Sequence, residues 1–276
     1  MKQKTAWLIF PCLAYLLVMY VLPTAIMFLA PFEEGLAPGL ANFGQALREP
    51  SYRRVMGTTF EISLIVTIGC IVLGYPTAYY LSRMEAKRAR VYLMLVTFPL
   101  WTSLLVRTYA WIALLQDAGV INSFLMQGGM TQQPVKLLYN QVSVAIGMVQ
   151  ILLPYAIITM YAVMVGIRSR LVQTAQILGA SPSRAFLHIF VPLSLPGLSA
   201  AALLVFIMGL GFFVTPALLG GRRDTMIGTL IQQQVVLMGD WNSAAVLSAL
   251  LLAATIVLLA VYSRFAKLSN LVSVRD

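Results

Sequence analysis

The sequence predicts an all-α membrane protein with six transmembrane helices. Of its 276 residues, 60% are hydrophobic and 10% are charged, whereas a soluble domain carries about 25% charged residues. The mean hydropathy of +0.85 comes from several separate apolar stretches, each near the roughly 20 residues that a helix needs to cross a bilayer. We therefore expect a single transmembrane domain over residues 1–276, with a core over residues 58–264, surrounded mainly by lipid.

Six apolar runs, separated by charge clusters and Gly/Pro turns, mark the expected spans. They cover residues 7–29, 58–81, 91–114, 140–164, 196–218 and 244–264. The first run follows Lys2 and Lys4 and is longer than the apolar region of a signal peptide, and no convincing cleavage site follows it. We expect it to be retained as the first span.

The basic residues predict how these spans are oriented. If the N-terminus is cytoplasmic, the cytoplasmic segments contain only two acids, Glu85 and Asp276, and the opposite side is close to neutral. Because Lys and Arg are enriched in cytoplasmic loops, this arrangement predicts that both termini are cytoplasmic. It accounts for twelve of the 19 basic residues, namely Lys2, Lys4, Arg83, Lys87, Arg88, Arg90, Arg168, Arg170, Arg184, Arg264, Lys267 and Arg275.

Several function classes are excluded by simple counts. The net charge of +10 follows from topology, and basic runs interleaved with exposed aromatics, as in nucleic-acid-binding proteins, are missing. Cys12 and Cys70 both lie in apolar segments, so neither a disulfide framework nor a zinc site is expected. None of the five lysines follows a glycine, so the chain has no phosphate-binding loop, and His188 is its only histidine, which excludes a His-Glu-x-x-His metalloprotease.

Prolines within or near the spans favour a transporter over a passive anchor. Pro76, Pro99, Pro154 and Pro216 each remove a backbone hydrogen bond and tend to kink a helix. Irregular backbone at membrane depth must face protein or a wet cavity. Ordinary kinked packing is the alternative explanation for each single proline.

The cytoplasmic loop at residues 165–192 is amphipathic and predicts two short helices joined by a sharp bend. Gly179 suits the left-handed position that follows a helix C-terminus. Ser181 is a good N-cap for the second helix, and Pro182 suits its first position.

An apolar stripe runs along the second helix of this loop. Ala185, Phe186, Ile189 and Phe190 recur at spacings of three and four, so they share one helix face. We expect this face to meet another surface on the cytoplasmic side, which is either the membrane surface or a docked partner. Pro192 is expected to end the helix.

This loop resembles the EAA loop of binding-protein-dependent ATP-binding cassette (ABC) importer permeases. The family pattern is Glu-Ala-Ala, three residues, Gly, then about ten residues to Ile-x-Leu-Pro, and it is matched by Ala175, Gly179, Phe186, Ile189 and Pro192. The resemblance implies that residues 165–192 dock into an ATPase subunit and that bulky substitution of Gly179 uncouples ATP hydrolysis from transport. The residues expected to form this coupling loop are Gln173, Ala175, Gly179, Ser181, Pro182, Phe186, Ile189 and Pro192.

The loop departs from the family pattern at its first two positions. Gln173 stands where the family has Glu, and Thr174 stands where it has Ala. Gln keeps a hydrogen-bond acceptor but carries no charge, so the salt bridge implied by the family is in doubt here. Coupling is therefore expected to depend on shape more than on charge.

Nearly the whole chain looks like the spermidine/putrescine branch of these permeases. The residues that carry this resemblance are Leu73–Tyr79, Phe98–Arg107 with Trp111, Gly119–Asn122, Gly147, Leu153 with Pro154, and Leu218–Gly221. It implies a type I ABC importer permease fold in the bacterial inner membrane, with no catalytic residues, metal or cofactor in this chain. The implied partners are a second permease subunit forming a heterodimer, two ATP-binding subunits that bind ATP and Mg²⁺, and a periplasmic solute-binding protein.

The resemblance implies that the transported solute is a polyamine, putrescine or spermidine. Relatives that import opines, phosphonates or metal ions share many of these positions and stay as alternatives. An ion-coupled secondary transporter is the alternative from another class, but such proteins place several ionisable groups within their spans. Co-purification with an ATPase would distinguish the two classes.

A path for a cation should offer carboxylates and aromatic faces. The candidates are Glu61, Asp117, Asp240 and Trp241, together with Arg107, Tyr109 and Trp111. A solvated outer rim is the alternative for the acids, and an ion pair with Glu61 is the alternative for Arg107, the only basic residue deep in an apolar stretch. If Arg107 lined the path instead, it would repel a polyamine and favour an anionic solute.

Overall fold

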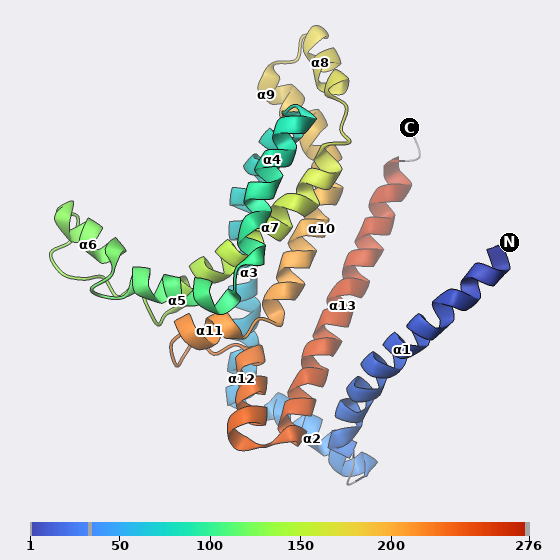
Figure 1. Cartoon of the computed structure of the whole chain (residues 1–276), viewed down its shortest axis with the longest axis vertical. Coiled ribbons are helices and arrows are strands. Elements are labelled where there is room, and N and C mark those ends of the chain that lie inside the picture. Colours follow the sequence, from blue (N-terminus) through green and yellow to red (C-terminus); the bar gives the residue numbers. More distant parts are fainter. Residues whose placement is uncertain (1, 33–34, 274–276) are drawn as a thin grey trace. The chain divides into compact units, whose positions relative to one another are not determined.

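The structure is a computed structural model that describes residues 2–32 and 35–273 (Figure 1). The side chains of residues 2–10, 12, 36–38 and 265–273 lie outside the description. Some of the residues that predict the orientation lie outside this description, namely Lys2, Lys4, Lys267, Arg275 and Asp276, and so does the Cys12 side chain. The cytoplasmic placement of both termini stays a prediction.

Helices make up nearly all of the described chain. The α-helices are α1 (Lys2–Leu29), α2 (Leu36–Arg48), α3 (Pro50–Arg83), α4 (Ala86–Thr97), α5 (Leu104–Leu115), α6 (Val120–Gln127), α7 (Gln141–Met164), α8 (Ser169–Ile177), α9 (Pro182–Ala185), α10 (Val191–Leu210), α11 (Val214–Leu219), α12 (Ile227–Gln233) and α13 (Trp241–Ser273). Short 3₁₀ turns cover Ala30–Phe32 (η1) and Phe98–Trp101 (η2), and π-helical turns cover Phe186–Phe190 (η3) and Gln234–Met238 (η4).

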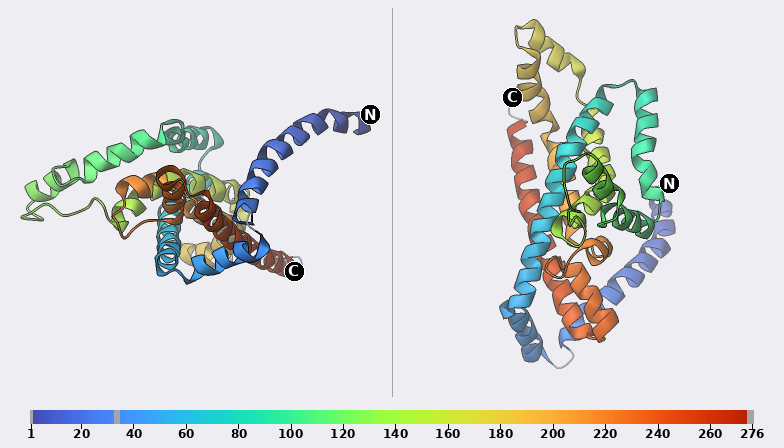
Figure 2. Two further views of the ribbon diagram at one scale, coloured as in Figure 1. Left: turned by 90° about the horizontal axis from the view of Figure 1, so that it is seen from below. Right: turned by 90° about the vertical axis from the view of Figure 1, so that its left-hand side faces the viewer.

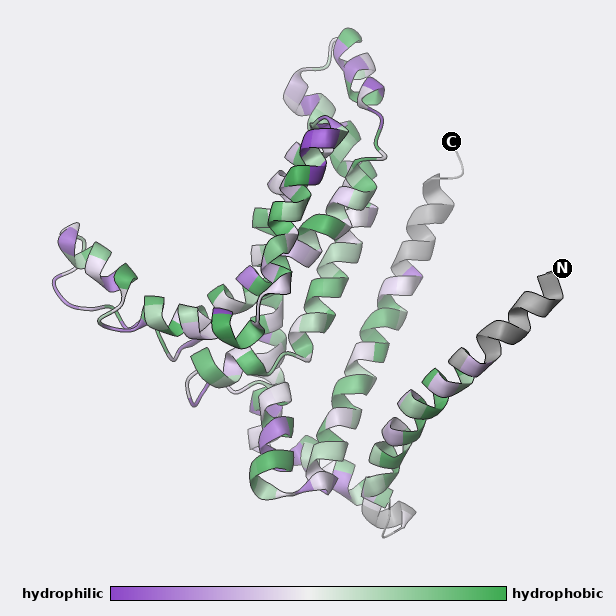
Figure 3. Cartoon of the chain, viewed as in Figure 1, coloured by the Kyte–Doolittle hydropathy of each residue, from purple (hydrophilic) through white to green (hydrophobic). Residues whose placement is uncertain are grey.

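Among the described residues, six segments are long and apolar enough to cross a membrane, which confirms the predicted number of spans. They are Leu13–Phe32, Pro50–Arg83, Leu104–Gln127, Gln141–Met164, Pro182–Leu210 and Trp241–Arg264. Hydrophobic residues run along their lengths, whereas hydrophilic residues gather at α8 and at the start of α4 (Figure 3).

The chain divides into two compact units, Met1–Arg54 with Leu230–Ala254, and Val55–Thr229 with Thr255–Asp276. In the second unit, α3, α7 and α10 lie side by side, and the loop that contains α8 and α9 extends beyond one end of α7 and α10 (Figures 1 and 2). The buried core of this unit is centred on α7, which contributes Met148, Leu152, Ile157 and Met160.

Small residues allow α7 to approach its neighbours closely. A Cβ atom added to Gly69 of α3 would lie 2.9 Å from Val149 of α7, and one added to Gly197 of α10 would lie 2.8 Å from Val163 of α7. Small residues at such contacts are typical of membrane helices, whose association depends on close backbone packing. This packing fixes α10, and with it the loop, relative to α3.

The predicted third span, residues 91–114, is wrong as one continuous helix. α4 ends at Thr97, the short turn η2 follows, and the backbone is extended at Thr102 and Ser103 before α5 begins. Pro99 lacks an N–H group and cannot donate to the carbonyl of the preceding turn, so the α-helical ladder ends here. The membrane-length segment instead joins α5 and α6 over Leu104–Gln127.

The predicted fifth span, residues 196–218, is also shifted, because the apolar helical segment covers Pro182–Leu210. Pro192 does not end the helix as expected, but lies at the second residue of α10, directly after η3. A π-helical turn changes the hydrogen-bond register, so the missing N–H and the ring of a proline are accommodated there without a break. At its other end the segment stops before Gly211, and Pro216 belongs to the separate helix α11.

Candidate functional site

The loop between α7 and α10 contains the predicted helix, bend and helix. α8 ends in paired backbone hydrogen bonds, from Ala180 N–H to the Ala175 carbonyl and from Gly179 N–H to the Gln176 carbonyl, each 3.0 Å long. Gly179 has a φ of 95°, which is open to glycine and strained for residues with a Cβ. The predicted end of the first helix at Gly179 is therefore confirmed, and the reason for glycine is conformational.

The second helix of the loop starts as predicted. The Ser181 hydroxyl accepts a hydrogen bond from the Arg184 N–H at 3.4 Å, and Pro182 occupies the first helical turn. This cap satisfies one of the N–H groups that a helix start leaves without a partner.

An aromatic cluster joins this second helix to the end of α3. The ring of Tyr79 lies edge-on to both Phe186, at 5.1 Å, and Phe190, at 4.8 Å between centroids, and the two phenylalanine rings stack at 5.6 Å. The guanidinium of Arg83 lies 4.6 Å from the Phe190 centroid and 5.6 Å from that of Tyr79. We call Tyr79, Arg83, Phe186 and Phe190 the aromatic anchor.

The anchor changes the interpretation of the apolar stripe. Ala185 and Phe190 are buried, and Phe186 and Ile189 are half-buried. The stripe packs at least in part against α3 of the same chain, so it is not available as a whole to a membrane surface or a partner. The expectation that the stripe faces an external surface is wrong for the buried residues Ala185 and Phe190, because the sequence does not show that Tyr79 packs against Phe190.

The apolar residues that the loop does expose lie elsewhere. Ile177 and Leu178, at the end of α8, are 84% and 81% exposed. Leu187 is also exposed, beside a surface depression of about 450 Å³ that is lined by Tyr79, Pro182, Ser183, Phe186 and Leu187. Large exposed apolar side chains on a polar loop indicate a contact surface.

The remaining predicted loop residues differ in exposure. Gln173, Gly179, Ser181, Pro182 and Pro192 are exposed, and Ala175 is half-buried. Gln173 therefore lies on the same accessible helix α8 that presents Ile177, as an uncharged side chain.

The substrate-path candidates on α5 do not share one face. Arg107 and Trp111, one turn apart, are half-buried, whereas Tyr109 is 58% exposed on another side of the helix. The Nε and Nη1 atoms of Arg107 are buried and have no hydrogen-bond partner among the residues that the structure describes. Asp117 follows the end of α5 and is exposed.

The proposed ion pair between Glu61 and Arg107 is not formed. Glu61 is exposed on α3, and neither it nor Arg107 takes part in an ion pair among the residues that the structure describes. Within the same described ranges, no group of three or more His, Cys, Asp or Glu side chains is placed to hold a metal ion.

Asp240 and Trp241 belong to the first compact unit and begin α13. The Asp240 carboxylate accepts a hydrogen bond from the Ser243 N–H at 2.9 Å, which makes it the N-cap of this helix. Hydrogen bonds from the Ser243 side chain and backbone hold the pKa of Asp240 below its usual value. Trp241 is 66% exposed.

Sequence reasoning missed the contribution of α3 to this site. Tyr79 and Arg83 are spaced by four residues at the end of a span, so they share a helix face, and an aromatic residue and a cation on one face can receive an aromatic helix. That spacing was visible in the sequence, but the partner of the pair was not.

Comparisons with known proteins agree with this architecture. Residues 70–270 match the family described as "Binding-protein-dependent transport system inner membrane component". The chain is 34% identical over 231 residues to the spermidine/putrescine transport system permease protein PotB of Escherichia coli (strain K12), covering 84% of each chain. It is 33% identical over 231 residues to PotB of Salmonella typhimurium (strain SL1344), covering 84% of this chain and 80% of the relative.

The fold is similar to that of a solved transporter subunit. A chain from a bacterial alginate ABC transporter, crystallised with an alginate pentasaccharide-bound periplasmic protein, superposes with a TM-score of 0.74 and 17% sequence identity, covering 95% of both chains. This likeness concerns the fold alone.

Proposed function

The chain belongs to the family of binding-protein-dependent transport system inner membrane components, and from this premise we propose that it is the permease subunit of a polyamine importer. The observation that carries the proposal is the loop with α8 and α9, a capped and anchored helix pair at the end of the membrane helices α7 and α10. The names of its PotB relatives support putrescine or spermidine as the solute.

The energy for transport comes from partner subunits in this proposal. The chain has no glycine followed by lysine, so it has no phosphate-binding loop of its own. Two ATP-binding subunits bind ATP and Mg²⁺, a second permease subunit completes a heterodimer, and a periplasmic solute-binding protein delivers the solute. The loop and both termini face the cytoplasm, in accordance with the distribution of basic residues.

The loop acts as a lever between the ATPase and the spans. A lever must be stiff and must be fixed to the element that it moves, because a flexible contact would absorb the motion. The backbone bonds at Gly179 stiffen the bend. The aromatic anchor joins the second helix to α3, and continuity with α10 joins it to the fifth span.

Docking depends on apolar shape at the tip of α8. Ile177 and Leu178 are exposed there, and Gln173 supplies no charge. Burying two such side chains contributes roughly 1.5–3 kcal/mol each. A complementary apolar cleft on the ATPase therefore favours docking without a salt bridge at residue 173.

The proposed function is tested on the complete importer reconstituted in membranes. ATPase activity is titrated with receptor protein loaded with putrescine, with spermidine, or with an anionic control solute. Stimulation by the two polyamine-loaded forms and not by the control supports the proposal. No stimulation by either polyamine overturns the substrate, and transport by the purified chain alone under an ion gradient overturns the importer class.

A further inference from the structure

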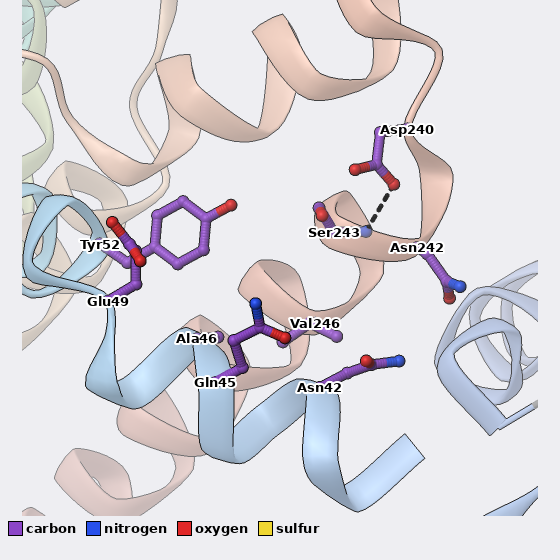
Figure 4. A pocket seen from close by; sticks show the side chains of 9 residues that line it. All are labelled: Asn42, Gln45, Ala46, Glu49, Tyr52, Asp240, Asn242, Ser243 and Val246. Atoms are coloured by element: carbon purple, nitrogen blue, oxygen red, sulfur yellow. Dashed lines mark hydrogen bonds between the residues drawn. The ribbon is translucent and has the colours of Figure 1, made fainter. Parts of the chain in front are cut away.

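A polar pocket lies within the first compact unit, remote in sequence from the coupling loop. Its volume is about 390 Å³, within the roughly 300–1,000 Å³ of small-molecule sites and near the lower end of that range. Its walls are the end of α2, the first turn of α3 and the first turns of α13 (Figure 4). The lining residues are Asn42, Gln45, Ala46, Glu49, Tyr52, Asp240, Asn242, Ser243 and Val246.

The first wall is shaped by the junction between α2 and α3. Glu49 ends α2 with an extended backbone, at φ −64° and ψ 117°, and its N–H donates to the Gln45 carbonyl at 2.9 Å. Pro50 then begins α3, and the Ser51 hydroxyl donates to Glu49 Oε1 at 3.3 Å. The junction thereby places Glu49 and Tyr52 together in the lining of the pocket (Figure 4).

The second wall is the start of α13. Gly239 has a φ of 67°, which turns the chain so that Asp240 caps the helix. One Asp240 oxygen accepts the Ser243 N–H, and the other is directed toward the pocket and the Tyr52 hydroxyl (Figure 4). The same hydrogen bonds lower the pKa of Asp240, so this carboxylate stays ionised at neutral pH.

The chemistry of the lining favours an organic cation. Two carboxylates, Glu49 and Asp240, come from opposite walls, and the carboxamides of Asn42, Gln45 and Asn242 add neutral oxygen acceptors. Tyr52 adds an aromatic ring and a hydroxyl. No Lys or Arg is among the residues that line the pocket, and Arg48 lines an adjoining depression that shares Gln45 and Glu49 with it. An ammonium group has donors only, so it matches this set of acceptors.

We infer that this pocket binds an ammonium group of a linear aliphatic diamine or polyamine, with Glu49 and Asp240 as its charged ligands. The inference rests on the proposed function for its choice of solute. In the predicted topology the lining segments, residues 42–52 and 240–246, lie on the outer side of the membrane, where the solute is released to the permease. The pocket is then an entry site of the importer.

Equilibrium binding of radiolabelled putrescine to the complete importer in nanodiscs, without receptor protein, tests the inference. Spermidine should displace the bound putrescine, and the dianion succinate should not. Glu49→Gln and Asp240→Asn should each weaken binding about tenfold, which corresponds to ~1.4 kcal/mol. Asp240→Asn is the more informative change, because asparagine is also a good N-cap and keeps the helix start intact.

Glu85→Gln is the matched control, since Glu85 is an exposed carboxylate outside the pocket. It should leave the dissociation constant unchanged, and thermal melting of each variant checks that the complex is folded. The pocket inference is overturned if the importer does not bind putrescine. It is also overturned if putrescine binds equally strongly to the wild type, Glu49→Gln and Asp240→Asn.

ATPase stimulation by putrescine-loaded receptor, measured on the same preparations, separates this inference from the proposed function. If the wild-type ATPase is stimulated but neither Glu49→Gln nor Asp240→Asn changes the affinity for putrescine, the pocket inference alone is overturned. An unstimulated complex with carboxylate-dependent binding overturns the proposed function and leaves the ammonium site in place.

Discussion

The guanidinium of Arg83, in the last turn of α3, lies 4.6 Å from the ring centroid of Phe190, at the end of the π-helical turn η3. This distance is within the ~6 Å over which a cation is attracted to an aromatic face. The contact links a residue expected only to mark the cytoplasmic side with the helix that carries the coupling loop. If the loop acts as the proposed lever, α3 is part of it.

Replacement of Arg83 tests this link. Arg83→Gln should lower the free energy of unfolding by about 0.5–2 kcal/mol, because the cation–π contact is lost. It should also lower the solute transported per ATP hydrolysed in the reconstituted importer. Arg88→Gln removes an exposed cation from the next segment and should change stability by less than about 0.5 kcal/mol. Equal effects of the two changes would show that Arg83 contributes only its charge.

Gly179 should be intolerant of side chains for conformational reasons. A Cβ added there meets no atom within 4 Å, but the φ of 95° is unfavourable for L-residues. Gly179→Ala should cost about 1–2 kcal/mol and reduce coupling of ATP hydrolysis to uptake. Gly179→Asn should recover part of the coupling, since asparagine tolerates left-handed backbone better.

Gly57→Ala is the control for this glycine. Gly57 lies inside α3, where an added Cβ also meets no atom within 4 Å, and alanine is the better helix former by about 0.8–1.0 kcal/mol. Transport assays measure the coupling of each variant, and thermal melting measures its stability. If ATP hydrolysis were coupled to uptake equally well in Gly179→Ala and Gly57→Ala, the bend would not need to be stiff.

The part of the fold that was predictable is the part that local chemistry determines. The bend at Gly179 and the cap at Ser181 depend on backbone preferences of single residues, and both occur where expected. The break near Pro99 and the continuity through Pro192 depend on whether the adjoining turn accommodates a proline, which composition does not reveal. Periodicity therefore located six spans, but it placed the third and the fifth incorrectly and began the second eight residues too late.

The candidate sites show the same division. The stripe containing Phe186 was visible from its spacing, but its partner Tyr79 is about a hundred residues earlier in the chain. Asp240 was singled out as an acid near a span, whereas Glu49 was not, because only folding places the α2–α3 junction beside the start of α13. Contacts between distant segments were the information that the sequence alone did not contain.

Docking to the ATPase should depend on Ile177 and Leu178 more than on Gln173. The double change Ile177→Ser and Leu178→Ser removes exposed apolar area from the tip of α8, and it should strongly reduce recovery of the ATPase subunit with the tagged permease. Gln173→Ala, on the same helix, should leave recovery within about twofold, because it removes no charge. If Gln173→Ala alone abolished recovery of the ATPase subunit, Gln173 would have to make a specific polar contact with it.

Asp240 gives a stability difference that depends on pH. Its folded-state pKa is lowered, so the stability that its charge contributes is present above the ordinary value of about 3.9 and is lost as the pH falls through the lower folded value. The melting temperature of the wild type relative to Asp240→Asn should thus be constant between about pH 5 and 7 and decrease below about pH 4. A difference that grows toward acid pH would contradict the assigned direction.

Glu61 and Arg107 should behave as independent residues. No ion pair joins them, and the buried Nε and Nη1 atoms of Arg107 have no hydrogen-bond partner in the described part of the chain. In a double-mutant cycle with Glu61→Gln and Arg107→Gln, the changes in unfolding free energy should add to within about 0.5 kcal/mol. Coupling of 1 kcal/mol or more, measured by denaturation of the purified subunit, would mean that the two side chains meet.

If Arg107 is independent of Glu61, its guanidinium is left to interact with a partner subunit or with the solute. Comparing putrescine uptake by Arg107→Gln with uptake by the wild type distinguishes these two roles. A guanidinium facing the solute path repels a polyamine, so its removal should then increase uptake, whereas loss of a contact with the partner permease should decrease it.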